Sequence, residues 1–145
     1  MEIKFTEIFT DLCEDKNQIN LAKEIGINQS QISRYLQGTI PTISSVVKIC
    51  DYFDCSIDYI SGLNEKKKYS LSQNGYNNKI FYEHYKNALN KNNLTHYQLA
   101  KKNIVCETSL RLWKTGRLPN FEVLYNIANY LNVSIDYLLG RINKM

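Results

Sequence analysis

A run of hydrogen-bonding side chains occupies residues 29 to 34 of the chain. The polar members of this run are Gln29, Ser30, Gln31, Ser33 and Arg34. In the DNA major groove, glutamine pairs with adenine, arginine pairs with guanine, and serine contacts several base edges. The chemistry that this set offers is therefore hydrogen bonding to bases. Taken alone, the same residues are more typical of the solvated side of an ordinary helix, so the flanking sequence has to decide.

The flanking residues predict two short helices joined by a tight turn, from residue 18 to residue 38. Apolar side chains recur at helical spacing on both helices: Leu21, Ala22 and Ile25, then Ile32, Tyr35 and Leu36. Gly26 stands where the chain has to turn sharply, because glycine tolerates positive φ. Asn28 can then cap the second helix with its side-chain oxygen. This arrangement buries one side of the second helix and turns the polar run outward.

A longer set of residues around these helices follows one spacing. Its members are Asn17, Gln18, Leu21, Ala22, Gly26, Ile27, Ser30, Ile32, Ser33, Tyr35, Gly38 and Pro41. In type and spacing this set resembles the lambda-repressor-like (Cro-type, XRE) helix-turn-helix domains. The resemblance implies that the helix at 29–37 enters the major groove of double-stranded DNA. The DNA-binding residues that it implies are Gln18, Asn28, Gln29, Ser30, Gln31, Ser33 and Arg34.

The chain contains a second copy of this pattern. When the sequence is shifted by 78 residues, Leu99–Lys101 falls on Leu21–Lys23, and Ser134–Tyr137 falls on Ser56–Tyr59. Two copies of about 60 residues each are too few for a solenoid and indicate two domains. We predict an all-α fold with two tandem five-helix lambda-repressor-like helix-turn-helix domains.

Five short helices are predicted in each copy. In the first copy they lie near residues 5–15, 19–25, 29–37, 43–53 and 56–62. In the second copy they lie near residues 80–92, 96–103, 107–115, 121–131 and 134–141. Ser56 and Ser134 are predicted to cap the fifth helices, and Gly62 and Gly140 are predicted to end them.

The predicted domains differ in charge. Residues 1–63 carry a net charge of −4, the polar linker at 64–79 carries +3, and residues 80–145 carry +5. Basic surfaces attract phosphate, and binding then releases counterions. We call the helices at 29–37 and 107–115 the reading helices. The reading helix that matches the family pattern better lies in the acidic domain, so the family pattern and the basic charge fall in different domains. The Lys66–Lys68 run is most simply a solvated part of the linker, and the alternative is that it steers DNA.

The second copy departs from the family pattern in its helix-turn-helix. Ile104 aligns with the turn residue Gly26, Cys106 with the cap Asn28, Glu107 with Gln29, Leu112 with Arg34, and His96 with Gln18. Phosphate repels a glutamate unless the carboxylate accepts from cytosine N4. An outward Leu112 can contact a thymine methyl group or pack against protein. The Gln18 position, which His96 takes here, usually contacts a phosphate in this family.

Polar and basic residues surround the second reading helix. The candidates for contacts with the DNA backbone in this copy are Lys101, Lys102, Thr108, Arg111, Lys114 and Arg117. The rival interpretation is that this copy keeps the fold but serves as a dimerisation or partner-binding domain. The sequence leaves both interpretations open.

The composition predicts a folded cytoplasmic protein without a metal or cofactor. A hydrophobic content of 43% supports a core, and no run approaches the roughly 20 apolar residues of a membrane span. The N-terminus has acids where a signal peptide needs bases. The four cysteines lack metal-ligand spacing, so reduced thiols are expected. Cys50 and Cys55 align with core positions, whereas Cys106 is expected to be exposed.

Two hypotheses of function follow. No glycine-rich phosphate loop, nucleophile motif or metal cluster marks an enzyme, and no domain for a small-molecule ligand is evident. The first hypothesis is a sequence-specific transcriptional regulator, a repressor of phage or mobile-element type. The family resemblance implies that it forms a homodimer. The alternative is a protein-binding module, such as an antitoxin, an anti-repressor or an inhibitor of a host system, whose second copy is the dimerisation or partner surface.

Overall fold

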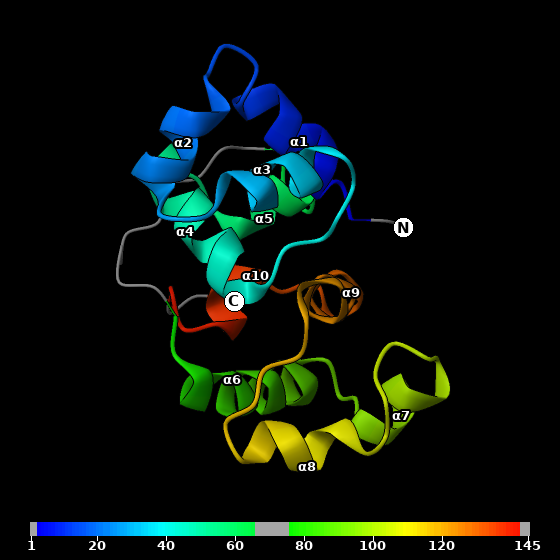
Figure 1. Cartoon of the computed structure of the whole chain (residues 1–145). Coiled ribbons are helices and arrows are strands. Elements are labelled where there is room, and N and C mark those ends of the chain that lie inside the picture. The colour runs from blue at the N-terminus through cyan, green and yellow to red at the C-terminus, as the bar shows by residue number, and fades with distance from the viewer. Residues whose placement is uncertain (1–2, 66–75, 143–145) are drawn as a thin grey trace. The chain divides into compact units, whose positions relative to one another are not determined.

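The computed structural model of the chain describes residues 3–65 and 76–142. Ten helices and no strands lie in these ranges, which confirms the predicted all-α class. The chain divides into two compact units, residues 1–70 and 71–145 (Figure 1). The division falls within the predicted linker, whose Lys66–Lys68 run lies outside the described residues. The predicted domain limits at 63 and 80 stay predictions.

The first unit is built around a cluster of aromatic rings. Its helices are α1 (Phe5–Leu12), α2 (Gln18–Ile25), α3 (Gln29–Leu36), α4 (Ile43–Phe53) and α5 (Ile57–Ser61). The rings of Phe5 and Phe9 stack with their centroids 5.2 Å apart, and Tyr35 meets them edge-on at 6.2 and 6.4 Å. Edge-on and stacked pairs of this kind stabilise a core beyond the burial of their area. Tyr35 thereby anchors the inner side of α3 on α1.

The second unit repeats this arrangement. Its helices are α6 (Asn78–Lys91), α7 (His96–Lys101), α8 (Ser109–Lys114), α9 (Phe121–Leu131) and α10 (Ile135–Leu138). Phe81 and Tyr85 stack at 5.7 Å, and Trp113 meets them edge-on at 5.4 and 5.2 Å. A buried ion pair joins α10 to the residues that follow it, because Arg141 Nε donates to Asp136 Oδ1 at 3.1 Å. The aromatic cluster anchors α8 on α6, as the first cluster anchors α3 on α1.

Side-chain caps determine where several helices begin. The Ser56 hydroxyl accepts from the Tyr59 N–H at 3.0 Å, and the Ser134 hydroxyl accepts from the Tyr137 N–H at 3.3 Å. Both caps were predicted and are confirmed. α6 begins at residue 78, two residues inside the predicted linker, because the Asn77 side chain caps it.

The glycines after the fifth helices behave differently in the two units. Gly62 ends α5 with a φ of +88°, as predicted, and a Cβ there would lie 2.8 Å from the Cβ of Lys4. Glycine is therefore required both by the backbone conformation and by the close approach of α1. The prediction for Gly140 is wrong, because α10 ends at Leu138 with Leu139 as its C-cap, and Gly140 follows at a φ of +77°.

Candidate nucleic-acid interface

In the first unit α2 and α3 form a helix-turn-helix pair (Figure 1). Gly26 joins them with a φ of +91°, and the next amide, Ile27 N–H, donates to the Ala22 carbonyl at 3.1 Å. No atom beyond its chain neighbours lies within 4 Å of the position that a Cβ on Gly26 would take. The need for glycine is therefore conformational, and the predicted turn is confirmed.

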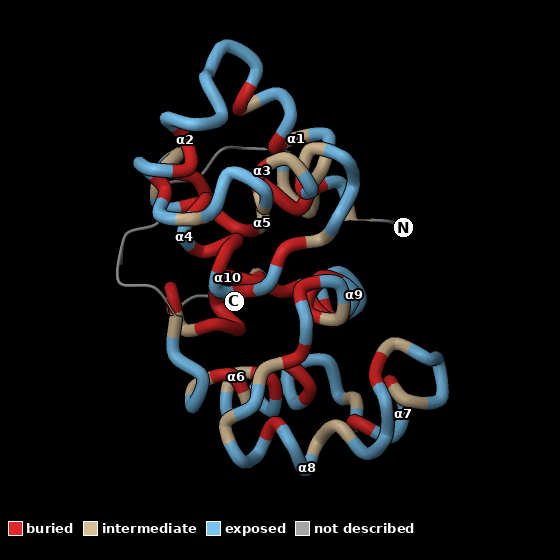
Figure 2. Tube along the Cα trace, viewed as in Figure 1, coloured by how far each residue is buried: buried red, intermediate tan, exposed pale blue. Residues whose placement is uncertain are grey.

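α3 buries one side and exposes the other (Figure 2). On the inner side Ile32 is fully buried and Tyr35 is 5% exposed. On the other side Gln29, Ser30 and Arg34 are exposed, while Gln31 and Ser33 are half-buried. The helix therefore presents Gln29, Ser30 and Arg34 at the surface, as predicted. The contacts with DNA themselves stay a prediction.

A capping box holds the start of α3. The backbone N–H of Asn28 donates to Gln31 Oε1 at 2.9 Å. This bond uses the carbonyl oxygen of the Gln31 side chain, and the NH₂ group takes no part in it. The predicted cap position of Asn28 is confirmed, but the role of Gln31 in it was missed. The signal was available, since an asparagine followed three residues later by glutamine is the signature of a capping box.

The start of α2 leaves Gln18 exposed. The residue before it, Asn17, caps the helix, and its side-chain oxygen accepts from the Ile19 N–H at 2.8 Å and the Asn20 N–H at 3.2 Å. These bonds satisfy two of the amides that a helix N-terminus leaves unpaired. The side chain of Gln18 takes no part in this cap.

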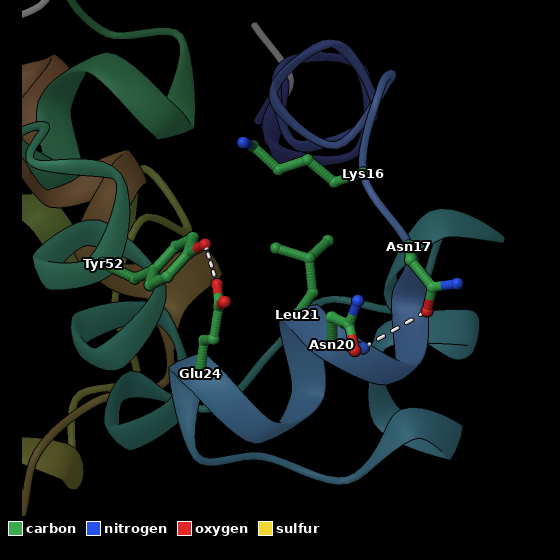
Figure 3. Close-up of a pocket in the computed structure, with 6 residues that line it drawn as sticks. All are labelled: Lys16, Asn17, Asn20, Leu21, Glu24 and Tyr52. Atoms are coloured by element: carbon green, nitrogen blue, oxygen red, sulfur yellow. Dashed lines mark hydrogen bonds between the residues drawn. The ribbon is translucent and has the colours of Figure 1, made fainter.

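A hollow of about 270 Å³ borders the start of α2 (Figure 3). It is lined by Lys16, Asn17, Asn20, Leu21, Glu24 and Tyr52. The Tyr52 hydroxyl donates to the Glu24 carboxylate, which links α4 to α2. The hydrogen bond to Glu24 raises the pKa of Tyr52, because it favours the neutral phenol. This link supports the helix-turn-helix pair on the side that α4 covers.

The second unit turns at Asn103, which corrects the alignment of Ile104 with Gly26. Asn103 has a φ of +60°, and the following Ile104 N–H donates to the Leu99 carbonyl at 3.1 Å. α7 ends at Lys101, so the chain turns one residue earlier than the alignment places the turn. Asparagine adopts the left-handed conformation far more readily than the β-branched isoleucine does.

The prediction that Cys106 caps the second reading helix is also wrong. α8 begins at Ser109, and residues 106–108 form a turn in which the Ser109 N–H donates to the Cys106 carbonyl at 3.0 Å. The Cys106 Sγ lies 3.2 Å from the Thr108 hydroxyl, and this contact lowers the pKa of Cys106 by stabilising the thiolate. Cys106 is exposed, whereas Cys50 and Cys55 are buried, and these three predictions are confirmed.

His96 points into the second unit and not toward solvent. Its side chain is 8% exposed, and its Nδ1 lies 2.8 Å from the Tyr85 hydroxyl. Its Nε2 lies 3.1 and 3.2 Å from the carbonyl oxygens of Cys106 and Glu107. Since carbonyl oxygens only accept, Nε2 carries the proton. His96 thus ties α7 to α6 and to the turn before α8, and it does not occupy the outward position that Gln18 has in the first unit.

The outward side of α7 and α8 mixes cations with apolar groups. All the residues that the sequence offers to the DNA backbone are exposed: Lys101, Lys102, Thr108, Arg111, Lys114 and Arg117. Tyr97 is 54% exposed and Leu112 is 47% exposed, and Lys101 Nζ lies 5.0 Å from the centroid of the Tyr97 ring. Backbone contacts by the basic residues stay a prediction.

Two further properties concern the described ranges 3–65 and 76–142. Within them, no group of three or more histidine, cysteine, aspartate or glutamate side chains is arranged to hold a metal ion. None of the helices described there is long and apolar enough to cross a membrane. Cys13 and Cys106 are free thiols. Burial raises the pKa of the Cys13 thiol to about 11, against a smaller, opposing effect of the Lys16 charge.

Two all-helical units, each with its second and third helices joined by a tight turn, define a tandem helix-turn-helix protein. The family model described as helix-turn-helix matches residues 14–60 and, a second time, residues 86–138, and the chain belongs to this family. The family consists of DNA-binding proteins that regulate transcription. Comparisons with the curated proteins and with the solved structures give no match.

Proposed function

We propose that this protein is a sequence-specific repressor of phage or mobile-element type that reads the DNA major groove with α3. The observation that carries the proposal is the outward set on α3, where Gln29, Ser30 and Arg34 are exposed and the capping box fixes the start of the helix. Glutamine and arginine make the bidentate contacts that distinguish adenine and guanine. Gln18, exposed at the start of α2, contributes a contact to a phosphate or a neighbouring base.

In this proposal the regulator works as a homodimer on double-stranded DNA in the cytoplasm. Two α3 helices, one from each chain, then enter successive major grooves, which lie about 34 Å apart. The regulator needs no cofactor or small-molecule ligand and catalyses no reaction. Its control comes from abundance, proteolysis or a protein partner.

Selection of binding sites from random duplex DNA by the full chain tests this proposal. At a salt concentration of about 0.15 M, exposed charges are screened beyond roughly 8 Å, so sequence-specific contacts dominate the selection. We expect an enriched motif with two half-sites. If the chain retains DNA only at low salt and no sequence is enriched, the proposal is wrong.

A second candidate function is a protein-binding module, such as an antitoxin, an anti-repressor or an inhibitor of a host system. The observation that favours it comes from the second unit: His96 is buried, and an exposed leucine, Leu112, aligns with Arg34 of the first unit. The net charge of −4 on residues 1–63 also weakens non-specific attraction to DNA. The same selection separates the two functions, because a protein-binding module enriches no DNA sequence.

A further inference from the structure

The outward side of α7 and α8 has the composition of a protein interface. We define the α7–α8 face by its exposed residues: Tyr97, Lys101, Lys102, Arg111, Leu112 and Lys114. Four large apolar side chains are exposed in the described residues, and Tyr97 and Leu112 are two of them. Protein interfaces combine exposed aromatic and apolar anchors at their centre with a polar rim, and Tyr97 and Leu112 are the anchors that this face offers.

Three features of this face are unfavourable for reading DNA. His96 is bound inside the unit by Tyr85 and by two backbone carbonyls, so the position that usually contacts a phosphate is withdrawn. The turn at residues 106–108 replaces the first turn of the reading helix, whose N-terminal residues contact bases in this motif. Glu107 is exposed in this turn and brings a negative charge to the place where the helix would approach the groove.

The charge of the face selects its partner. Lys101, Lys102, Arg111 and Lys114 supply four cations against the one acidic residue between positions 96 and 114, Glu107, and residues 80–145 carry a net charge of +5. Complementary potentials favour an acidic partner and give specificity and a fast association rate. The Lys101 amine lies over the Tyr97 ring at 5.0 Å, so charge and apolar surface meet at one point of the face.

We propose that the α7–α8 face binds an acidic protein segment that also carries apolar side chains. The cations attract the segment, and Tyr97 and Leu112 receive its apolar groups. This inference rests on the proposed function in one respect: the first unit reads DNA, and the partner on the second unit controls the regulator. The occupant is a protein, and duplex DNA on the same face is the competing outcome of the test.

Panning a random peptide library on phage against the immobilised full chain tests the inference. We expect enriched peptides that are rich in Asp and Glu and contain Leu, Ile or Phe. Tyr97→Gln and Leu112→Gln should each lower the affinity for a selected peptide by about tenfold, because removing an interface anchor removes much of the binding energy. Tyr130→Gln is the matched control, since Tyr130 is 39% exposed on α9 and lies outside the face. Both target side chains are exposed, so unchanged circular dichroism should accompany each substitution.

Three results would overturn the inference. The first is that the library shows no enrichment. The second is that the enriched peptides bind the Tyr97→Gln and Leu112→Gln variants as tightly as they bind the parent chain. The third is that these variants lose affinity for duplex DNA and keep their affinity for the peptide. The third result assigns the face to DNA. The selection on random duplex DNA is a separate assay, so failure of the proposed function and failure of this inference give different results.

Discussion

At the scale of single residues, Arg34 is the charged side chain on the outward side of α3. We predict that Arg34→Ala lowers affinity for the selected operator by about 1–3 kcal/mol and relaxes the preference at one base position. The physical reason is the loss of a bidentate contact to a guanine edge. Titration of the operator and of its single-base variants measures both effects. Lys48→Ala, which removes another exposed cation, this one from α4, is the control. An equal loss on random DNA would mark Arg34 as a phosphate contact instead.

Gln31 has a structural role that can be separated from DNA binding. We predict that Gln31→Ala lowers the free energy of unfolding by about 0.5–2 kcal/mol, as the loss of a capping interaction does. Gln31→Glu should keep most of the stability, because a glutamate oxygen can accept from the Asn28 N–H in the same way. Urea unfolding followed by circular dichroism compares the two variants. Equal destabilisation by both substitutions would contradict a capping role.

Cys106 differs from the other three cysteines in exposure, and from Cys13 in the direction of its pKa shift. Its pKa is lowered by the Thr108 hydroxyl, whereas burial raises the pKa of Cys13. A lower pKa means a larger thiolate fraction at a given pH, and the thiolate is the form that reacts. We predict one rapidly alkylated thiol in the native chain, with iodoacetamide as reagent and mass spectrometry as readout. Thr108→Val should shift the pH profile of this reaction upward, and an unchanged profile would refute the assigned cause.

At the scale of elements, the turns after α2 and after α7 both require a residue with positive φ, and different residues provide it. Gly26 has a φ of +91° and Asn103 a φ of +60°. We predict that Gly26→Ala destabilises the chain by about 1–2 kcal/mol, the cost of a left-handed conformation for a residue with a Cβ. Asn103→Gly should change stability by less than about 1 kcal/mol, because glycine accepts the same conformation. Circular dichroism follows the first variant, and fluorescence of Trp113, the single tryptophan, follows the second. A stable Gly26→Ala chain would show that the turn can relax.

The element pattern could be predicted because it depends on local sequence. Apolar periodicity located the ten helices of residues 3–65 and 76–142, and Ser56 and Ser134 marked two of their starts. The turn at Asn103 was not predicted, because alignment to Gly26 assumed that α7 and α2 have the same length. Where a helix ends depends on the balance of local bonds around its last turn, and that balance does not follow from a repeat.

The site was predictable to the extent that it depends on outward orientation. The exposure of Gln29, Ser30 and Arg34 follows from the burial of Ile32 and Tyr35 on the other side of α3. The inward position of His96 could not be predicted in the same way, because its partners come from two separate segments of the second unit, α6 and the turn before α8. Long-range contacts of this kind decide whether a polar residue serves the surface or the core.

At the scale of the whole molecule, the two reading helices do not carry the same information. Gln29 and Arg34 on α3 correspond to Glu107, just before α8, and to Leu112 on α8. If α3 and α8 of one chain read DNA together, the two half-sites must differ in sequence. If two chains each use α3, the half-sites must be identical and related by a two-fold axis. The symmetry of the operator therefore reports which helices read it.

We predict an operator that is an inverted repeat, bound by two chains. The centres of its half-sites should lie about 34 Å apart or at a multiple of that distance, because each α3 enters a major groove on the same side of the duplex. Sedimentation of the complex measures the stoichiometry, and site selection gives the symmetry. Arg34→Ala should relax the same base in both half-sites, whereas Leu112→Gln should leave the selected sequence unchanged. The opposite outcome is a site with unlike half-sites that binds a single chain and whose selected sequence changes with Leu112→Gln. That outcome would mean that α8 reads bases. The proposed homodimer and the proposed protein partner of the α7–α8 face would then both be wrong.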